Sequence, residues 1–359
     1  MEAKKIKIVL SGGGTGGSVS PLLAVADELK EAEFVFIGTK KGKPEKDLIA
    51  GYRMKYYGIY SGKLRRYFDW QNLLDPFKIF LGFFESLFIL LKEKPRTIFS
   101  AGGFVSVPVI WAGFFLGIPA VIHQQDVLPS LSNKLAAWIA KKITVSFEKS
   151  LNDFSKTKTI LTGNPARKEI LLGNRERAIK RFNLEENLPV LLVIGGGTGS
   201  QKINQLIFSI IPQLVEFCQV IHLTGEKNLQ LITHNSQLSK RYHRYKFLTE
   251  EMADAYMVAD LVISRAGLGV LTELSALAKP AMIIPIPHSH QEANALYFAS
   301  KKAAIYLDQN QLDKEIFLAK IKEVISDKET LKNLSEKIKL LYQQGAALKI
   351  AEIIRKIGA

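Results

Sequence analysis

Cysteine is nearly absent from the sequence, because Cys218 is the only one among 359 residues. A single thiol excludes an internal disulfide framework and any metal cluster built on cysteines. Long apolar runs are also missing. The nearest candidate, residues 108–122, contains two prolines and two glycines and falls short of the roughly 18 apolar residues that a membrane-spanning helix needs. Only five residues precede the first apolar run, so we expect no signal peptide and a cytoplasmic protein.

Acidic residues are outnumbered, since 34 Asp and Glu stand against 49 Lys and Arg and give a net charge of +15. A basic surface suits nucleic acid, an anionic membrane or an anionic substrate, and it also serves solubility alone. The sequence carries no nucleic-acid-binding motif, no low-complexity segment and no local repeat. We therefore expect no nucleic-acid partner and favour an anionic membrane surface together with phosphate-bearing substrates. The length predicts about two domains.

The most informative stretch is a glycine-rich loop at residues 11–21, SGGGTGGSVSP. It follows the apolar run 6–10 and precedes a helical pattern at 22–29, which predicts a strand, a loop and a helix. Glycines allow positive φ and a close approach to a ligand, and amides at a helix N-terminus suit a phosphate. No lysine follows, as it would in a P-loop, and the spacing is not GxGxxG. By itself the loop is equally compatible with a tight turn.

Two further glycine loops follow apolar strands. Residues 101–106 (AGGFVS) come after the strand 97–100, and residues 195–200 (GGGTGS) come after the strand 190–194. In parallel sheets such loops lie at the ligand-binding edge. The alternation of strands and helices predicts an α/β chain with two Rossmann-like domains, joined near residues 162–167 (TGNPAR), where the residue before proline disfavours helix. A ligand between two such domains would meet loops from both.

Polar residues follow or accompany other predicted elements. His123 and Asp126 stand just beyond the strand 120–122, where α/β enzymes place active-site residues, although a single histidine is more often structural. Glu273 lies in a helix behind a glycine turn and could hold a ribose diol, as an acidic residue does in dinucleotide folds; the alternative is an ordinary surface glutamate. His288 and His290 have no carboxylate or cysteine partner, so we expect no metal site there.

A helix predicted over residues 77–91, with Asp75 and Pro76 at its start, is apolar over most of its circumference. Its polar positions form one narrow strip. Two interpretations are open. Either the helix is buried on two sides, or its apolar face inserts into a membrane surface beside basic residues that approach lipid headgroups. In the second interpretation the apolar residues are Phe77, Phe80, Leu81, Phe84 and Phe88, and the basic residues are Lys63, Arg65 and Arg66.

Several motifs occur in the order that one family shows: GGTGGSVSPLLAVADEL, GGFVSVP, HQQDVLPSLSNK, TGNPAR, HLTG, EEMADAYMVADLVISRAG, TELSA and HQEANA. On these motifs the chain resembles the MurG family of glycosyltransferases of peptidoglycan synthesis. The resemblance implies the GT-B fold. It also implies inverting transfer of N-acetylglucosamine from UDP-N-acetylglucosamine to the muramyl sugar of an undecaprenyl-diphosphate-linked acceptor, lipid I, which becomes lipid II. The family needs no metal or other cofactor and is peripheral to the cytoplasmic face of the cell membrane.

The resemblance also implies that the two domains bind different substrates. Residues 1–163 would form an N-terminal domain that binds the acceptor and the membrane, with the helix 77–91 matching the family's membrane-facing apolar patch. Residues 164–344 would form the domain that binds the UDP-sugar. A C-terminal helix at about 345–359 would cross back to the first domain.

Site residues are implied where the motifs match. Glu273 would hold the ribose hydroxyls, and the backbone near Leu248 and Thr249 would pair with uracil. The other donor-site positions are Arg167, Gly197, Thr198, Gly199, Arg265, Gly267, Leu268, Gly269, Gln291 and Asn294. The acceptor-facing positions are Gly13, Gly14, Thr15, Gly16, Gly17, Gly102, Gly103, Gln124 and Asn133.

The chain departs from the family where the chemistry is expected. Ser18 replaces a family histidine, Phe104 replaces a common tyrosine, and residues 123–126 read HQQD where the family has HEQN. Serine cannot act as a general base near neutral pH, whereas an imidazole or a carboxylate can. We therefore predict that Asp126 or His123 removes the proton of the acceptor hydroxyl.

Three alternatives stay open at this point. A GT-B enzyme for another sugar donor or lipid acceptor would account for the changes at positions 18 and 104. A UDP-sugar epimerase shares the architecture but would need no lipid and no wide apolar helix face. A catalytically impaired, UDP-sugar-binding membrane scaffold would account for the missing histidine, although the intact donor positions Arg167, Glu273 and Gln291 argue against it.

Overall fold

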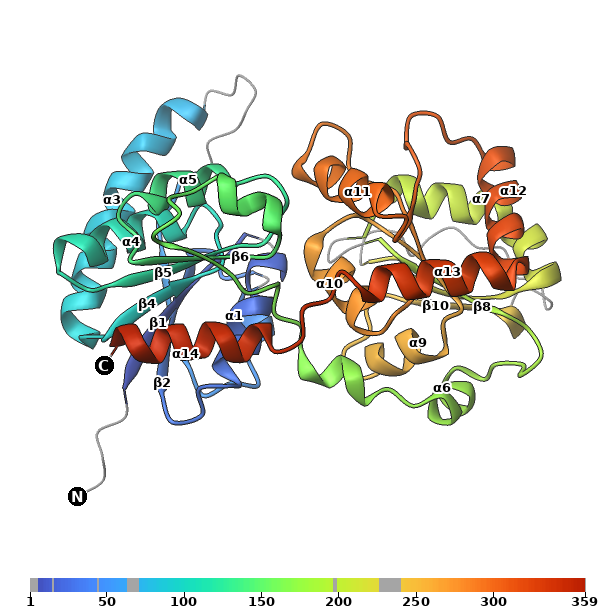
Figure 1. The fold of residues 1–359 in the computed structure, drawn as a ribbon, viewed down its shortest axis with the longest axis horizontal. Coiled ribbons are helices and arrows are strands. Elements are labelled where there is room, and N and C mark those ends of the chain that lie inside the picture. Colours follow the sequence, from blue (N-terminus) through green and yellow to red (C-terminus); the bar gives the residue numbers. More distant parts are fainter. Residues whose placement is uncertain are drawn as a thin grey trace. The chain divides into compact units, whose positions relative to one another are not determined.

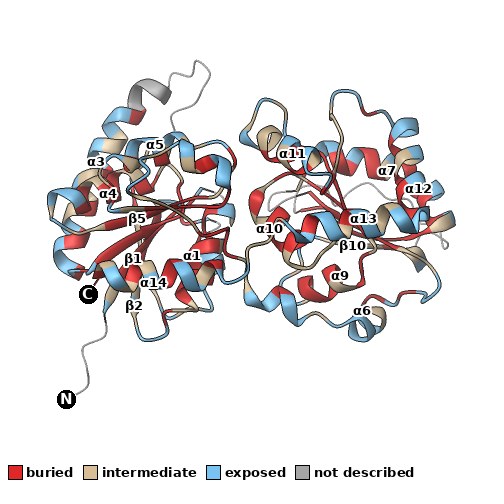
Figure 2. Ribbon diagram, in the orientation of Figure 1, coloured by how far each residue is buried: buried red, intermediate tan, exposed pale blue. Residues whose placement is uncertain are grey.

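The computed structural model describes residues 6–14, 16–43, 45–62, 71–195, 199–225 and 240–358. The chain divides into two compact units. Unit 1 combines Met1–Ala166 with Gln343–Ala359, and unit 2 is Arg167–Tyr342. Each unit is built on a parallel sheet with helices on both faces (Figure 1). The buried residues follow the strands and the helix faces that pack on them (Figure 2).

The described strands of unit 1 form one parallel sheet in the order β3-β2-β1-β4-β5-β6-β7. The order reverses between β1 and β4, and this is where α/β sheets open a ligand crevice at the carboxyl ends of their strands. The first two glycine loops follow these two adjacent strands, so the topology brings the loops together. The bounds are β1 Lys7–Ser11, β2 Glu33–Thr39, β3 Lys55–Ile59, β4 Thr97–Ser100, β5 Ala120–Gln124, β6 Lys142–Val145 and β7 Thr159–Leu161.

Two sets of helices cover this sheet. On one face lie α1 (Ser20–Ala26), the short α2 (Glu45–Ile49) and the C-terminal helix α14 (Ala346–Gly358); on the other lie α3 (Gln71–Glu93), α4 (Ser106–Phe115) and α5 (Leu131–Ala137). The short turns η1 (Gly16–Ser18) and η2 (Glu148–Asn152) complete the described part. Ile350 and Ile354 of α14 are buried with Leu22 and Val25 of α1, and the two helices run side by side (Figure 1).

The described strands of unit 2 form a second parallel sheet in the order β10-β9-β8-β11-β12-β13, which reverses between β8 and β11. The strands are β8 Val190–Ile194, β9 Gln219–Leu223, β10 Tyr242–Tyr245, β11 Leu261–Ser264, β12 Ala281–Ile283 and β13 Ile305–Tyr306. The helical elements are η3 Lys168–Leu172, α6 Arg175–Phe182, α7 Gln201–Phe217, α9 Met252–Val258, α10 Leu268–Ala276, α11 His290–Ser300, α12 Lys314–Ser326 and α13 Lys328–Lys339.

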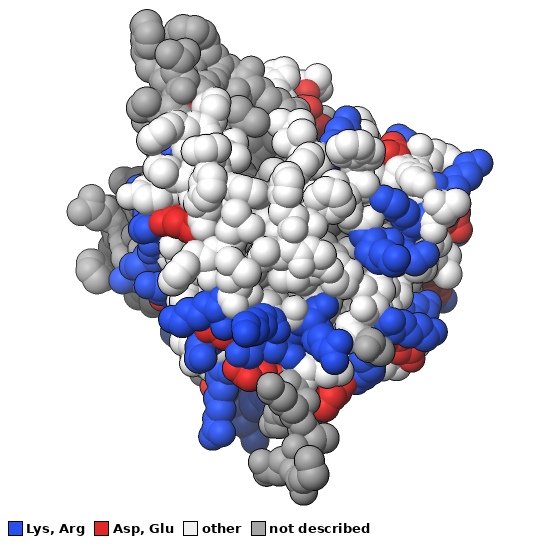
Figure 3. Space-filling model, turned by 90° about the vertical axis from the view of Figure 1, so that its left-hand side faces the viewer, with Lys and Arg blue, Asp and Glu red and all other residues white. Residues whose placement is uncertain are grey.

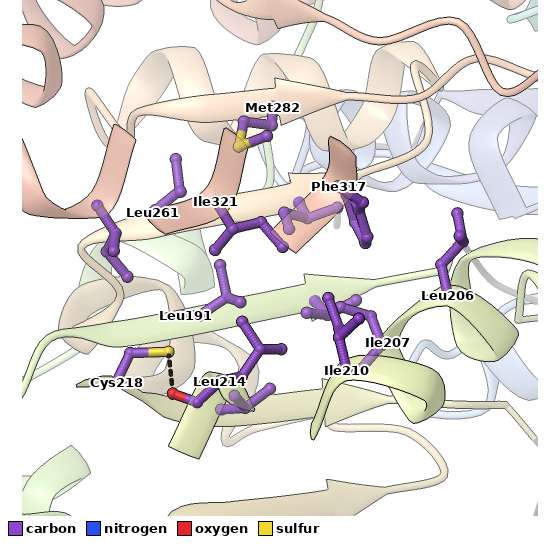
Figure 4. Packing of buried hydrophobic residues seen from close by; sticks show 14 of the residues in the cluster. Leu191, Leu206, Ile207, Ile210, Leu214, Cys218, Leu261, Met282, Phe317 and Ile321 are labelled. Carbon is purple, nitrogen blue, oxygen red and sulfur yellow. Dashed lines mark hydrogen bonds between the residues drawn. The ribbon is translucent and has the colours of Figure 1, made fainter. Parts of the chain in front are cut away.

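One face of the second sheet packs against α7 and α12 in a dense aliphatic cluster (Figure 4). Leu191 and Leu261 of the strands meet Ile210 of α7 and Ile321 of α12 there. Cys218, which follows α7, is part of this cluster, and its Sγ lies 3.3 Å from the carbonyl oxygen of Leu214 in the last turn of α7. Burial raises the pKa of this thiol to about 12, so it stays protonated and unreactive at neutral pH.

Two predicted boundaries are wrong. The strand expected to end at Ile122 continues to Gln124, because His123 and Gln124 pair with residues 144 and 145 of β6 and extend the ladder. Helix α3 begins at Gln71 rather than at Pro76, so the proline lies inside the helix, in its second turn.

Candidate active site

The first two glycine loops lie against each other at the carboxyl ends of β1 and β4. A Cβ atom on Gly103 would lie 2.9 Å from the carbonyl oxygen of Gly13, and one on Gly14 would lie 2.7 Å from a ring carbon of Phe104. Gly14 and Gly103 also have φ of +85° and +89°, a conformation that side chains disfavour. Glycine is therefore required at these positions by close packing and by the backbone.

The Gly14 amide faces into the protein rather than toward a ligand. It donates a hydrogen bond of 2.8 Å to Oε1 of Glu45, the first residue of α2. The same oxygen accepts the hydroxyl of Thr39 at 2.9 Å. That Gly13 and Gly14 face the acceptor diphosphate stays a prediction, and in this structure the Gly14 amide is engaged by Glu45. Sequence reasoning missed Glu45, because nothing in its local pattern marks it as a partner of this loop.

The first loop is accessible on both sides of Thr15, which lies outside the described residues. Gly14 and Gly17 are exposed and Gly16 is partly exposed, whereas Gly13 is buried. Ser18 is also buried, with its Oγ 3.4 Å from the Gly13 carbonyl oxygen. The structure thus leaves Gly14, Gly16 and Gly17 at the surface, although the amide of Gly14 is engaged by Glu45.

His123 is not at the surface of the strand end. Its ring is fully buried, with Nδ1 2.9 Å from Thr144 Oγ1 and Nε2 2.9 Å from Asn164 Oδ1. Burial lowers the pKa of His123 to about 4, so the imidazole is neutral at physiological pH. Both nitrogens are engaged within unit 1, and the structure disfavours His123 as the residue that meets the acceptor hydroxyl.

Gln124 and Asn133 shape the loop that follows β5. Asn133 Nδ2 donates to Gln124 Oε1 at 2.8 Å and to the His123 carbonyl oxygen at 3.0 Å. Gln124 Nε2 in turn donates to the carbonyl oxygen of Leu128 at 2.9 Å. Asn133 Oδ1 lies 3.5 Å from the position of a Cβ on Gly102, which places it beside the second glycine loop. Both predicted residues are thus near this loop, and both are largely buried.

Asp126 is the partly exposed carboxylate of the same loop. Its neighbour Gln125 donates from Nε2 to the Ala101 carbonyl oxygen at 2.9 Å, which fastens the loop to the start of the second glycine loop. The structure therefore brings Asp126 to the edge where Gly102 and Gly103 lie. Among the two predicted bases, Asp126 is the one that a substrate can reach.

In unit 2, Glu273 lies at the centre of a three-residue cluster. Its Oε1 accepts from Arg167 Nε at 3.0 Å and Nη2 at 2.8 Å, and its Oε2 accepts from the Tyr256 hydroxyl at 2.8 Å. Glu273 and Tyr256 are both buried, so the alternative of an ordinary surface glutamate is wrong. Burial and the neighbouring Glu273 raise the pKa of Tyr256 well above its usual value, which keeps the hydroxyl a donor.

Burial alone would lower the pKa of Arg167, but the attraction and hydrogen bonds of Glu273 outweigh it and raise that pKa. Arg167 therefore keeps its positive charge. Sequence reasoning placed Arg167 and Glu273 at one site but missed Tyr256, although it lies within the quoted EEMADAYMVADLVISRAG motif.

The N-terminus of α10 is the second focus of unit 2. Gly267 precedes the helix, and a Cβ on Gly269 would meet open space. Gln291 approaches from α11, with its Nε2 4.0 Å from the position of a Cβ on Gly267. Asn294 donates to the Ala266 carbonyl oxygen at 3.1 Å and holds the turn. The free amides of a helix N-terminus beside glycines favour an anionic ligand.

Arg265 and Leu268 flank this turn and help to hold it in place. Leu268 is buried at the first position of α10. Arg265 donates to the carbonyl oxygens of Ile284 and Pro285 at 2.9 and 3.0 Å and to Gln309 Oε1 at 2.7 Å. Its guanidinium thus holds the segment after β12 by hydrogen bonds. Gln309 is a further residue of this region that the sequence did not indicate.

The remaining donor-site residues lie at the ends of β8, β9 and β10. Gly199 has φ of +75° and packs against the Thr224 carbonyl oxygen, and Gly197 and Thr198 lie outside the described residues. Leu248 is partly buried and Thr249 is exposed. The Thr249 amide donates to Glu251 Oε2 at 3.2 Å. Their contact with a uracil stays a prediction.

Comparison with known proteins decides the family. The N-terminal domain model of glycosyltransferase family 28 matches residues 8–145, and its C-terminal domain model matches residues 190–352. A Clostridium kluyveri protein named UDP-N-acetylglucosamine--N-acetylmuramyl-(pentapeptide) pyrophosphoryl-undecaprenol N-acetylglucosamine transferase is 38% identical over 98% of this chain and 99% of its own length. The chain belongs to the MurG family of glycosyltransferases. A Clostridium perfringens member with the same name is 40% identical over 92% of this chain and 93% of its own length.

Solved structures agree with this chain in fold. Acinetobacter baumannii MurG aligns over 98% of this chain and 99% of its own with a TM-score of 0.74 at 23% identity. A UDP-GlcNAc 2-epimerase from Neisseria meningitidis aligns over 98% of this chain and all of its own, with a TM-score of 0.69 at 14% identity. At these identities the likeness shows the fold alone. The predicted α/β class with two Rossmann-like units, the GT-B fold, is confirmed, and so is the predicted family.

Helix α3 of this MurG-family chain turns its polar strip toward the protein. Glu85 accepts the Tyr60 amide at 2.7 Å and pairs with Lys40 at 2.8 Å. A Cβ on Gly82 would collide with the Tyr60 carbonyl oxygen, and Ser86 is fully buried. The polar residues therefore fasten the helix to the ends of β2 and β3.

Several apolar side chains of α3 face outward, whereas Ile89 and Leu90 are buried in the core of unit 1. Phe77, Phe80, Phe84 and Phe88 are 63%, 59%, 51% and 70% exposed, and Leu81 is exposed as well. The interpretation of a helix buried on two sides is therefore wrong. No helix among the described residues is both long and apolar enough to cross a bilayer.

Exposed apolar side chains continue from α3 onto its neighbours. The rings of Phe83 and Phe115 lie 5.6 Å apart between α3 and α4, and those of Trp111 and Trp138 lie 6.5 Å apart between α4 and the end of α5. Figure 3 shows a broad uncharged area on this side of the molecule, bordered by Lys and Arg side chains. We call the exposed residues the apolar face: Phe77, Phe80, Leu81, Phe84, Phe88, Leu91, Phe114, Phe115 and Trp138. Lys63, Arg65 and Arg66 lie outside the described residues.

Proposed function

We propose that this chain transfers N-acetylglucosamine from UDP-N-acetylglucosamine to the muramyl sugar of an undecaprenyl-diphosphate-linked lipid, with inversion at the anomeric carbon. The observation that carries the proposal is the set of relatives named for this reaction, which are 36% to 40% identical over almost the whole chain. The reaction is a single displacement. The acceptor oxygen attacks the anomeric carbon, the bond to the UDP oxygen breaks, and the hydroxyl proton passes to a base.

The donor site is assigned to unit 2. The ribose hydroxyls donate to Glu273, which Arg167 and Tyr256 hold in place by hydrogen bonds. The amides at the start of α10, at Leu268 and Gly269, and the guanidinium of Arg167 stabilise the negative charge that develops on the leaving diphosphate. Gln291 and Asn294 complete the sugar side of this site, and the backbone at Leu248 and Thr249 receives the uracil.

The acceptor site is assigned to the glycine-loop edge of unit 1. Gly16, Gly17, Gly102 and Gly103 offer close approach to a diphosphate-linked sugar. Asp126 takes the hydroxyl proton, because it is the predicted base that a substrate can reach. His123 holds the end of β5 through Thr144 and Asn164 and acts on the reaction only by position.

The deciding experiment measures UDP release by the purified chain from UDP-N-acetylglucosamine and a lipid I analogue, with EDTA present because the family resemblance implies no metal. We expect release that depends on the acceptor and yields a disaccharide product. Release without acceptor would point to a hydrolase, which transfers the sugar to water, whereas an epimerase would convert the UDP-sugar without net UDP release. Donor binding without any release would point to another acceptor or to lost catalysis, and the same assay with other lipid-linked sugars separates these two outcomes.

We also propose that the apolar face rests on the surface of an anionic membrane, where it would meet a lipid-linked substrate. Exposed aromatic side chains on three adjacent helices are more than a monomer's surface requires, and a border of basic side chains suits anionic headgroups. The polar strip of α3 is used for packing, so the helix cannot turn its apolar side inward without losing the Glu85 contacts.

Sedimentation with vesicles of phosphatidylcholine and phosphatidylglycerol tests the membrane proposal. The double variant Phe80→Asp, Phe84→Asp is expected to lose most vesicle binding. Leu340→Asp changes a still more exposed apolar residue in unit 2 and is expected to bind as the wild type does. If the double variant is folded and still sediments fully, the apolar face is not the membrane contact.

A further inference from the structure

Glu45 is a buried carboxylate that the proposed reaction does not use. It is fully buried, and its Oε1 accepts hydrogen bonds from the Gly14 amide at 2.8 Å and from the Thr39 hydroxyl at 2.9 Å. Its Oε2 is also buried and has no hydrogen-bond partner among the residues that the structure describes. Burying a carboxylate oxygen without a hydrogen-bond donor costs folding free energy, so its presence beside a substrate loop needs an explanation.

The first glycine loop is shaped around this carboxylate. A Cβ on Gly13 would collide with Glu45 Oε1, so glycine at this position leaves room for the carboxylate. In a phosphate-binding loop, a backbone amide such as that of Gly14 donates to a phosphate oxygen. Here the amide donates to the oxygen of a resident anion instead.

A second anion at the same turn would meet the charge of the first. Like charges repel strongly where burial excludes water, and Glu45 is fully buried. The neighbouring loop differs, because the Gly102 amide donates to the neutral Ser100 hydroxyl at 3.1 Å. Gly102 is buried and Gly103 is partly exposed, both with positive φ of +88° and +89°, and the acceptor of the Gly102 amide carries no charge.

We propose that Glu45 is a specificity-determining residue for the acceptor, and this rests on the proposed function. Its carboxylate keeps the acceptor diphosphate off the turn at Gly13 and Gly14 and leaves the diphosphate to the loop at Gly102 and Gly103. The first turn then receives a neutral part of the acceptor, its sugar. Oε2 is buried and does not itself contact the acceptor, but the charge that it shares with Oε1 repels an anion at this turn.

The test measures the binding of inorganic pyrophosphate by calorimetry, with saturating UDP present to occupy unit 2. Glu45→Gln keeps an oxygen for the Gly14 and Thr39 donors but removes the charge, so we expect it to bind pyrophosphate at least about tenfold more tightly than the wild type. Glu31→Gln removes the same charge from an exposed pair with Arg355 in unit 1 and is expected to change nothing. Unchanged or weaker binding in Glu45→Gln, or equal tightening in Glu31→Gln, overturns the proposal.

A second measurement uses the wild type, in case Glu45→Gln does not fold. In protein labelled with nitrogen-15 glycine and saturated with UDP, pyrophosphate is expected to shift the amide resonances of Gly102 and Gly103. The Gly14 resonance should stay in place, and a Gly14 shift that follows pyrophosphate saturation overturns the proposal. Neither measurement involves sugar transfer. A chain that passes both and fails the transfer assay therefore refutes the proposed reaction without touching the role of Glu45.

Discussion

The substitution Glu93→Gln removes the charge that fastens the C-terminal end of α3, the helix that carries most of the apolar face. Glu93 is 6% exposed and accepts Lys7 Nζ at 2.7 Å and the Tyr57 hydroxyl at 2.6 Å. These contacts join α3 to β1 and β3. The hydrogen bond from Lys7, and then that from Tyr57, holds the pKa of Glu93 down to about 2 from an ordinary 4.5.

The expected loss of unfolding free energy follows from this difference in the pKa of Glu93. A carboxyl whose pKa falls from 4.5 to about 2 on folding contributes about 3 kcal/mol at neutral pH, since one pKa unit equals about 1.4 kcal/mol. Lys7 is 22% exposed at its side chain, so solvent screens the pair and lowers the expected loss to about 2 kcal/mol. Glutamine keeps the shape and part of the hydrogen bonding, which makes this loss mainly electrostatic.

The assay can isolate unit 1. All three tryptophans, at positions 70, 111 and 138, belong to unit 1 and none to unit 2, so tryptophan fluorescence during urea denaturation follows the unfolding of unit 1. Glu31→Gln is the matched control. It removes an exposed carboxylate of the same unit, paired with Arg355, and is expected to cost less than about 0.5 kcal/mol.

The pH dependence supplies the sharper test. Because folding lowers the pKa of Glu93, its contribution is fully present above pH 4.5 and is lost as the pH falls toward about 2. The difference in unfolding free energy between wild type and Glu93→Gln should therefore shrink as the pH is lowered through this window. A loss below about 0.5 kcal/mol at neutral pH, or a difference that does not change with pH, would refute the reasoning.

Three further outcomes are expected. Asp126→Asn should lower kcat at least about 100-fold while the affinity for the donor stays intact. His123→Asn should mainly lower the stability of unit 1. Near-normal turnover in Asp126→Asn would show that Asp126 is not the base. Tyr256→Phe deletes one donor to Glu273 and should weaken UDP binding in calorimetry by about tenfold, and unchanged affinity would contradict a positioning role. Ile354→Ala in the core beside α1 should cost unit 1 about 2 to 5 kcal/mol in the tryptophan assay, and a negligible loss would mean that α14 is not part of that core.

The local pattern of the sequence was enough for the architecture. Apolar runs followed by glycines predicted strands and loops, and their recurrence predicted two parallel α/β units. The motifs then predicted the MurG family, which the comparisons confirm. Such features are readable because strand periodicity and turn residues act over a few neighbouring positions. The apolar arc of α3 was also visible, but the sequence could not say whether protein or solvent covers it.

Only the tertiary structure decided whether each polar side chain is buried and which partners it contacts. His123 and Asp126 stand three positions apart, yet β6 and Asn164 bury the first while the second remains accessible. Glu45 meets Gly14, and Tyr256 meets Glu273, across 31 and 17 positions of the chain. Charge, burial and pKa depend on partners that the fold brings from such distances, and no short-range pattern records them. Local periodicity therefore determined the elements and their order, whereas long-range packing determined which of the named residues can meet a substrate.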